Sequence, residues 1–284
     1  MIGMISRNLK VFFKDKTSVF FSLLAVFITL GLYLFFLSDI WVSNFSEYEG
    51  ARYLMDTWIM AGILAITSVT TTMGAYGTMI DDKTRKIEKD FTVSPFSARK
   101  RTLAYIVSAI IIGVVMSLVT LLLAELYIVI NGGTMMSAIV LLKVLGLILL
   151  STMTNSSLVF FLVSFFSTNS SFGTASTVIG TLIGFLTGVY LPIGQLPESV
   201  QYVIKVFPPS HSAALFRQIM MADPMSVTFA GAPAEYLTSF YDQMGVTLTF
   251  GSTTLPAWAN ILVLVGSAVL FYCLALINIS RKKV

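Results

Sequence analysis

The sequence predicts an all-α integral membrane protein with six transmembrane helices. Of its 284 residues, 56% are hydrophobic and only 11% are charged, whereas an average soluble domain is roughly 25% charged. The apolar residues occur in long runs that lack the alternation of a transmembrane β-barrel, which favours helices. This composition excludes an ordinary soluble domain, a disordered chain and a disulfide-rich scaffold.

Six apolar runs are long enough to span a bilayer, which takes about 20 mostly apolar residues in a helix. We expect the first run to be retained rather than cleaved as a signal peptide, because it is long and closes on the bulky residues Phe35, Phe36 and Leu37. The predicted spans are residues 18–37, 58–80, 103–130, 136–166, 172–191 and 257–279.

The basic residues predict the orientation, because short cytoplasmic loops of membrane proteins are enriched in Lys and Arg. Most of them lie in the N-terminal segment, in the loop at 81–101 and at the C-terminus, whereas the opposite loops hold Arg52, Lys205 and Arg217. Both termini and the loop at 81–101 are therefore expected in the cytoplasm.

Residues 1–17 are predicted to form an amphipathic helix in the cytoplasmic headgroup region. At about 100° per residue, its apolar and basic side chains separate onto two faces, as is typical of interfacial helices. This helix either anchors and orients the first span or also touches a cytoplasmic partner. The apolar face holds Ile2, Ile5, Leu9, Phe12 and Phe13, and the other holds Arg7, Lys10 and Lys14.

The sequence lacks motifs for chemistry. It contains no GxxxxGK[ST] phosphate-binding loop, no GxGxxG turn and no HExxH motif. One Cys and one His provide neither an internal disulfide nor a metal-ligand cluster. We therefore expect no enzyme, no bound cofactor and no metal site, and any energy for work must come from a partner.

The loop at 81–101 has a specific pattern, in which an acidic residue is followed by a basic residue, a bulky residue, a Ser-Pro pair and a basic cluster. Asp82, Arg85, Phe91, Ser94, Pro95 and Arg99 supply it. A short mixed-charge helix of this kind, stopped by a proline, can dock into a groove on a soluble protein. The alternative is a solvated charge run that only enforces topology.

This loop resembles the one between the second and third helices of ABC type-2 exporter permeases. The chain departs from that family at Lys86 and Ile87, where Gly and Thr are common. The resemblance implies that the loop is a coupling helix that receives motion from an ATP-binding subunit. The coupling residues would be Asp82, Arg85, Ile87, Glu88, Phe91, Pro95 and Arg99.

The resemblance covers nearly the whole chain and implies one transmembrane permease domain over residues 1–284. Such a permease sits in a bacterial plasma membrane, pairs with a second permease subunit and binds cytoplasmic ATP-binding cassette subunits, which hold ATP and Mg. The pair would be a homodimer or a heterodimer. No nucleic-acid partner is implied.

Two spans carry stripes of small residues, which let helix backbones approach closely in lipid. Such stripes serve either packing within one subunit or a dimer interface or substrate path, and the resemblance favours the second reading. The fifth span carries Thr177, Gly180, Thr181, Gly184 and Gly188, and the second carries Thr67, Thr71 and Gly74.

Between the fifth and sixth spans, residues 192–256 form an external segment with two short helical stretches separated by Pro208 and Pro209. The resemblance implies that they form an external gate of re-entrant short helices. Re-entrant backbone is tolerated where protein or a cavity surrounds it. The alternative is an ordinary surface loop.

Glu125 and Lys143 are ionisable residues inside predicted spans, equidistant in sequence from Thr134, which ends the turn between those spans. An antiparallel hairpin places them at equal depth. Because lone charges in lipid are costly, we predict a Glu125–Lys143 ion pair near the external leaflet. It would serve as a structural pin or, alternatively, in ion coupling.

An apolar path with hydroxyls and few charges predicts export of a hydrophobic or amphipathic substrate, such as a drug, an antimicrobial peptide or a lipid. Sodium export is an alternative, because hydroxyl and carbonyl oxygens can bind hard cations. A membrane sensor or assembly protein that does not transport is another. An intramembrane enzyme is disfavoured, because Glu125 and Lys143 would neutralise each other.

Overall fold

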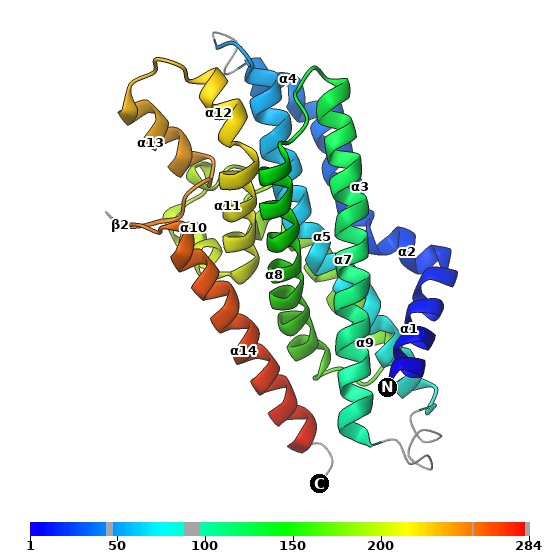
Figure 1. The fold of residues 1–284 in the computed structure, drawn as a ribbon. Coiled ribbons are helices and arrows are strands. Elements are labelled where there is room, and N and C mark those ends of the chain that lie inside the picture. Colours follow the sequence, from blue (N-terminus) through cyan, green and yellow to red (C-terminus); the bar gives the residue numbers. More distant parts are fainter. Residues whose placement is uncertain (44–47, 88–96, 252, 282–284) are drawn as a thin grey trace.

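The computed structural model describes residues 1–284 except 44–47, 88–96, 252 and 282–284 (Figure 1). The described residues are mainly helical, with one short antiparallel hairpin of β1 Thr249–Phe250 and β2 Thr253–Thr254. The helices are α1 Ile2–Lys14, α2 Lys16–Ser22, α3 Leu24–Leu32, the π-helix η1 Tyr33–Leu37, α4 Ser38–Ser43, α5 Ala51–Thr84, α7 Ala98–Ile130, α8 Ala138–Val163, α9 Asn169–Leu186, the 3₁₀-helix η2 Ile193–Gln195, α10 Glu198–Val206, α11 Pro208–Met220, α12 Ala222–Thr228, α13 Ala234–Gln243 and α14 Ala257–Arg281.

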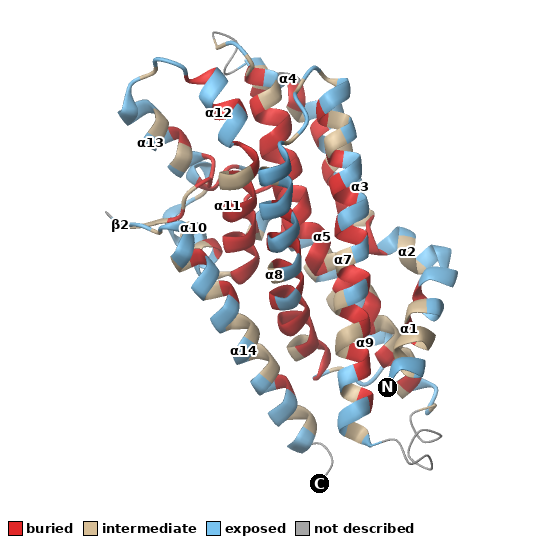
Figure 2. Ribbon diagram, viewed as in Figure 1, coloured by how far each residue is buried: buried red, intermediate tan, exposed pale blue. Residues whose placement is uncertain are grey.

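Helix α5 is the centre of the bundle. Every residue from Leu54 to Val69 is buried, as expected for a helix that is hydrophobic on all sides. It contacts α7, α8, α9 and α11. Figure 2 shows the buried residues concentrated on α5 and α11, whereas much of α14 faces outward.

The described part contains four helices long and apolar enough to cross a membrane, α5, α7, α8 and α14. A further bent pair, residues 16–22 and 24–37, meets the same test as one span with a 46° bend. A multi-pass, all-α membrane protein is therefore confirmed, although a total of six spans is not. The fifth predicted span, residues 172–191, corresponds to α9, which is only 18 residues long and rich in Ser, Thr and Gly.

The first predicted span, residues 18–37, is not one straight helix. The hydroxyl of Ser22 donates to the carbonyl of Val19 at 2.8 Å, and the Leu23 amide donates to the carbonyl of Phe20 at 3.1 Å. Such local bonds compete with the regular helical ladder and bend helices. The chain therefore turns at Leu23, and α2 packs beside α5.

One end of the bundle carries α1, the end of α5, the start of α7 and the end of α14 (Figure 1). We call it the basic end, because these segments contain Arg7, Lys83, Arg85, Arg99 and Arg281. Helices α12 and α13 lie at the opposite end. This arrangement agrees with the expectation from the sequence that the segments rich in Lys and Arg lie on the same side of the bundle.

Helix α11 enters the bundle rather than lying on its surface. It contacts α5, α8 and α14, and every residue from Pro208 to Arg217 is buried. Pro208 and Pro209 occupy its first turn, where a missing amide hydrogen costs no helical bond. The proline break separates α10 from α11, at the place where the sequence predicted it.

Candidate functional site

At the basic end, the carboxylate of Asp82 joins three helices. Its oxygens accept hydrogen bonds from both terminal nitrogens of Arg7 on α1, at 2.5 and 2.7 Å, and from the hydroxyl of Tyr105 on α7, at 2.5 Å. The bond to Asp82 raises the pKa of Arg7 above its ordinary value. We call these three residues the Asp82 cluster.

The cluster is largely closed to solvent, because the side chain of Asp82 is 2% exposed and that of Arg7 is 34% exposed. Next to it, the amide of Asn8 donates to the hydroxyl of Ser108 at 3.3 Å. Bidentate Arg–carboxylate pairs are strong and directional. The cluster therefore fixes the N-terminal helix onto the end of α5 and the start of α7.

The predicted coupling residues fall into three groups. Asp82 is buried beneath α1, so its predicted coupling role would act through its bonds to Arg7 and Tyr105 rather than through direct contact with a partner. Arg85 is exposed and pairs with Asp81 at 2.9 Å, Ile87 is half-buried, and Arg99 is exposed on the first turn of α7. Their coupling role stays a prediction. Glu88, Phe91 and Pro95 lie outside the described residues.

The small-residue stripe of α5 packs within this chain. Thr67 and Thr71 are fully buried, and their hydroxyls donate to the carbonyls of Ile63 and Thr67 at 2.8 and 2.6 Å. A Cβ on Gly74 would lie 2.9 Å from the Cβ of Ser22. The prediction that Thr67, Thr71 and Gly74 line a path or a dimer interface is therefore wrong.

The stripe of α9 divides in two. Thr177 and Thr181 are exposed, and nothing lies within 4 Å of a Cβ built on Gly180. Gly184, in contrast, packs against the ring of Tyr190, and Gly188 adopts a positive φ of 62° in the turn that follows α9. Only the first half of the predicted stripe is thus available to another molecule.

The predicted Glu125–Lys143 ion pair is wrong. No ion pair joins these residues within 4.0 Å in the described chain, and a Glu125 carboxylate oxygen instead accepts from the amide of Met136 at 3.1 Å. Lys143 is exposed. Equal depth in a hairpin does not determine the direction of a side chain around each helix axis.

Away from the basic end, a buried arginine that the sequence analysis did not single out joins several segments. The guanidinium of Arg217 on α11 donates to the carbonyls of Gly188 and Gly245, at 2.8 and 3.2 Å. It also lies 4.6 Å from the centre of the Trp58 ring on α5. Both glycines have positive φ, so one side chain holds two tight turns against the central helix.

The Asp82 cluster and Arg217 each hold separate segments of the chain together. Within the described residues, no group of three or more His, Cys, Asp or Glu side chains could hold a metal ion. A model of a known family, described as an ABC-2 family transporter protein, matches residues 37–277. The chain belongs to the ABC-2 transporter family. A comparison with curated proteins finds no match.

Membership of the ABC-2 family identifies the chain as a multi-pass permease, the membrane part of an ABC transporter. ABC-2 permeases carry out transport and work with ATP-binding cassette subunits. The match includes Asp82, Tyr105 and Arg217, whereas Arg7 lies before it. The Asp82 cluster therefore ties a segment outside the family match to the ABC-2 core.

Proposed function

We propose that this ABC-2 permease is the transmembrane subunit of an ATP-driven exporter. Separate ATP-binding subunits would dock on residues 81–101, and the permease would move a hydrophobic or amphipathic substrate outward. In this proposal, the basic end faces the cytoplasm, the bent pair is the first crossing and α9 is the fifth. Helices α10 and α11 would re-enter from the external side of a plasma membrane.

The observation that carries the proposal is the position of the Asp82 cluster. Asp82 lies near the end of α5 and Tyr105 near the start of α7, on either side of the loop that joins these helices. The hydroxyl of Tyr105 donates to Asp82, and Asp82 also accepts from Arg7. A displacement of the loop would thus pull on α1, α5 and α7 together. A rigid junction of this kind is what a coupling segment requires.

The nature of the proposed substrate rests on the exposed surface of α9. The hydroxyls of Thr177 and Thr181 already donate to the carbonyls of Gly173 and Thr177, at 3.0 and 2.8 Å. Valine and leucine side chains beside them, Val178 and Leu182, are exposed. A weakly polar, uncharged face favours apolar or amphipathic cargo over a highly charged polymer.

Deletion of residues 87–91 is expected to abolish stimulation of ATP hydrolysis when the permease is co-purified with its ATP-binding subunit. The deletion removes the predicted docking helix but leaves the Asp82 cluster intact. A control removes residues 230–233, in the largely exposed connection between α12 and α13. If the loop deletion retains full stimulation while the complex persists, the proposed docking site is wrong.

Gly180→Leu is expected to disrupt a permease dimer without unfolding the subunit. The subunit has room for the new side chain, because nothing lies within 4 Å of a Cβ at Gly180, whereas a helix packed closely across the glycine would clash. The mass of the purified protein in detergent measures the dimer. Gly146→Leu on α8 and Gly266→Leu on α14 are equally open control positions, and equal dimer loss in all three would rule out a specific α9 interface.

A further inference from the structure

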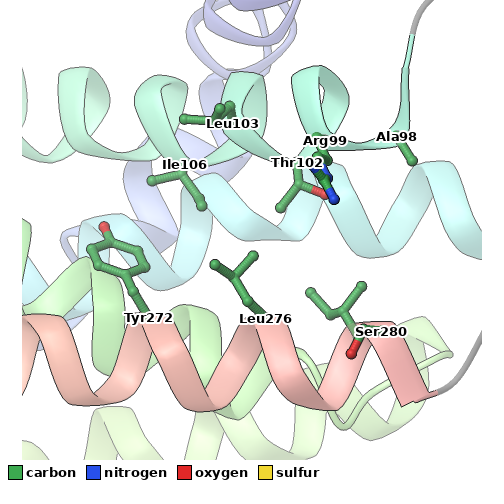
Figure 3. A pocket seen from close by; sticks show the side chains of 9 residues that line it. Ala98, Arg99, Thr102, Leu103, Ile106, Tyr272, Leu276 and Ser280 are labelled. Carbon is green, nitrogen blue, oxygen red and sulfur yellow. The ribbon is translucent and has the colours of Figure 1, made fainter.

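A crevice of about 810 Å³ lies between the start of α7 and the end of α14. In Figure 3, Tyr272 and Leu276 reach from α14 toward α7, and Ile106 reaches back from α7. Arg99 and Ser280 lie at one end, beside the termini of the two helices, and Tyr272 lies at the other. The crevice is lined by Ala98, Arg99, Thr102, Leu103, Ile106, Tyr272, Leu276, Ile279 and Ser280.

The walls are apolar over most of their length. From Arg99 to Ile106 the crevice extends roughly 10 Å, at about 1.5 Å per helical residue. The hydroxyl of Tyr272 at the deep end donates to Ser156 at 3.3 Å, so its proton already has an acceptor. This shape fits part of an alkyl chain.

The mouth of the crevice is positively charged. Arg99 is exposed, and no described carboxylate lies within 4.0 Å of its guanidinium. None of the lining residues is acidic. Asp82 lines a smaller pocket that shares Thr102 and Ile279 with the crevice, but its carboxylate is bonded to Arg7 and Tyr105. The crevice thus combines an apolar interior with a basic entrance.

The crevice also opens toward the lipid phase. Helices α7 and α14 are both candidate membrane spans, and Leu103 and Leu276 are 50% and 51% exposed. It lies at the basic end, which faces the cytoplasm in the proposed function. The cytoplasmic leaflet carries anionic phospholipids, which basic pockets between helices bind.

We propose that this crevice binds one anionic phospholipid of the cytoplasmic leaflet. One acyl chain lies along Ile106, Leu276 and Ile279, and the phosphate meets Arg99. The site is separate from the exposed half of α9, which was proposed as the dimer interface or substrate path. The inference rests on the proposed orientation of the permease but not on ATP-driven export.

Native mass spectrometry of the full-length permease tests the proposal. The protein is purified in detergent and incubated with micelles containing phosphatidylglycerol or phosphatidylcholine. Wild type is expected to retain one phosphatidylglycerol in preference to phosphatidylcholine. Arg99→Gln is expected to reduce this preference roughly fivefold, the effect of one basic residue near an anionic surface. Leu276→Trp fills the crevice and is expected to abolish retention of both lipids.

Two matched controls accompany these variants. Lys100→Gln removes an exposed neighbouring charge that does not line the crevice, and Leu270→Trp adds the same bulk at an exposed position of α14 outside it. Both are expected to bind lipid like wild type. Equal retention of the two lipids by wild type, or equal losses in Leu276→Trp and Leu270→Trp, would overturn the proposal.

The same spectra distinguish a second occupant. If another copy of the chain covers the crevice, Leu276→Trp would convert dimers to monomers without changing lipid retention, which would also overturn the proposal. If Leu276→Trp fails to fold, Arg99→Gln still tests the proposal, because Arg99 is exposed and its substitution leaves the core intact. An unchanged preference of Arg99→Gln for phosphatidylglycerol would then overturn it. Lipid retention is measured without the ATP-binding subunit, so failure of coupling does not affect the result.

Discussion

The R217M variant is expected to lose about 3 kcal/mol of folding stability, because one guanidinium supports two buried turns. Methionine has a similar length but donates no hydrogen bond, so the carbonyls of Gly188 and Gly245 lose a partner. An unsatisfied buried acceptor costs about 1–3 kcal/mol. The contact with the Trp58 ring, worth about 2 kcal/mol when desolvated, is lost as well.

The desolvation of the arginine offsets part of this loss. Arg217 is 0% exposed, its Nε has no hydrogen-bond partner, and no described carboxylate lies within 4.0 Å of it. Replacing a buried charge by an apolar side chain removes that cost and can be neutral. We expect the loss of the hydrogen bonds to the two carbonyls to outweigh the gain from removing the buried charge, because methionine cannot donate to them.

Thermal unfolding in detergent at a fixed scan rate measures the effect, because large membrane proteins commonly unfold irreversibly. R217K is expected to fall between wild type and R217M, since an ammonium lacks the planar fork that reaches both carbonyls. K205M on α10, where the lysine bonds Gln201 at 3.2 Å, serves as control. A midpoint for R217M equal to that of wild type would mean that desolvation cancels the contacts.

The sequence predicted the positions of most long helices well. The span expected at 136–166 is observed as Ala138–Val163, and that at 257–279 as Ala257–Arg281. The bilayer itself imposes this regularity, because each crossing needs about 20 apolar residues. Basic residues and prolines likewise predicted which segments lie at the same end and where α10 gives way to α11.

The direction of side chains around each helix could not be predicted in the same way. Helix α5 is buried on all sides along most of its length, so its small residues do not indicate which neighbour they face. Thr67 and Thr71 proved to be internal, whereas Thr177 and Thr181 on α9 are exposed. The expected equal depth of Glu125 and Lys143 also did not predict their contact, because the contact depends on how α7 and α8 are rotated against each other.

The sequence around Arg217 does contain a pattern that indicates a buried contact. It is the only Lys, Arg, Asp or Glu between Phe207 and Met221, and a lone charge in an apolar helix usually marks a buried contact. Its partners, however, are backbone carbonyls and an aromatic ring from distant segments. No side-chain pattern identifies such partners, because their positions depend on the assembled fold.

Removing the carboxylate of Asp82 is expected to uncouple the permease from its ATP-binding subunit. D82N cannot balance the charge of Arg7, and it replaces one of the two acceptor oxygens by an NH₂ group that faces the donors of Arg7 and Tyr105. Because Arg7 is partly exposed, we expect a loss of about 1–3 kcal/mol, below that of a fully buried pair. If this free energy is lost from the coupling step, stimulation of ATP hydrolysis by the permease should fall about five- to 150-fold, since each 1.4 kcal/mol corresponds to a factor of ten.

A double-mutant cycle separates the pair from general damage. R7Q and D82N each remove one partner, and R7Q/D82N is expected to be little worse than either single variant, because they disrupt the same bond. The ion pair of Asp81 and Arg85, at the same end of α5 but 37% and 68% exposed, provides the control. R85Q should change stability by less than about 1 kcal/mol. Additive losses for R7Q and D82N would show that the two residues act independently and that α1 is not coupled through Asp82.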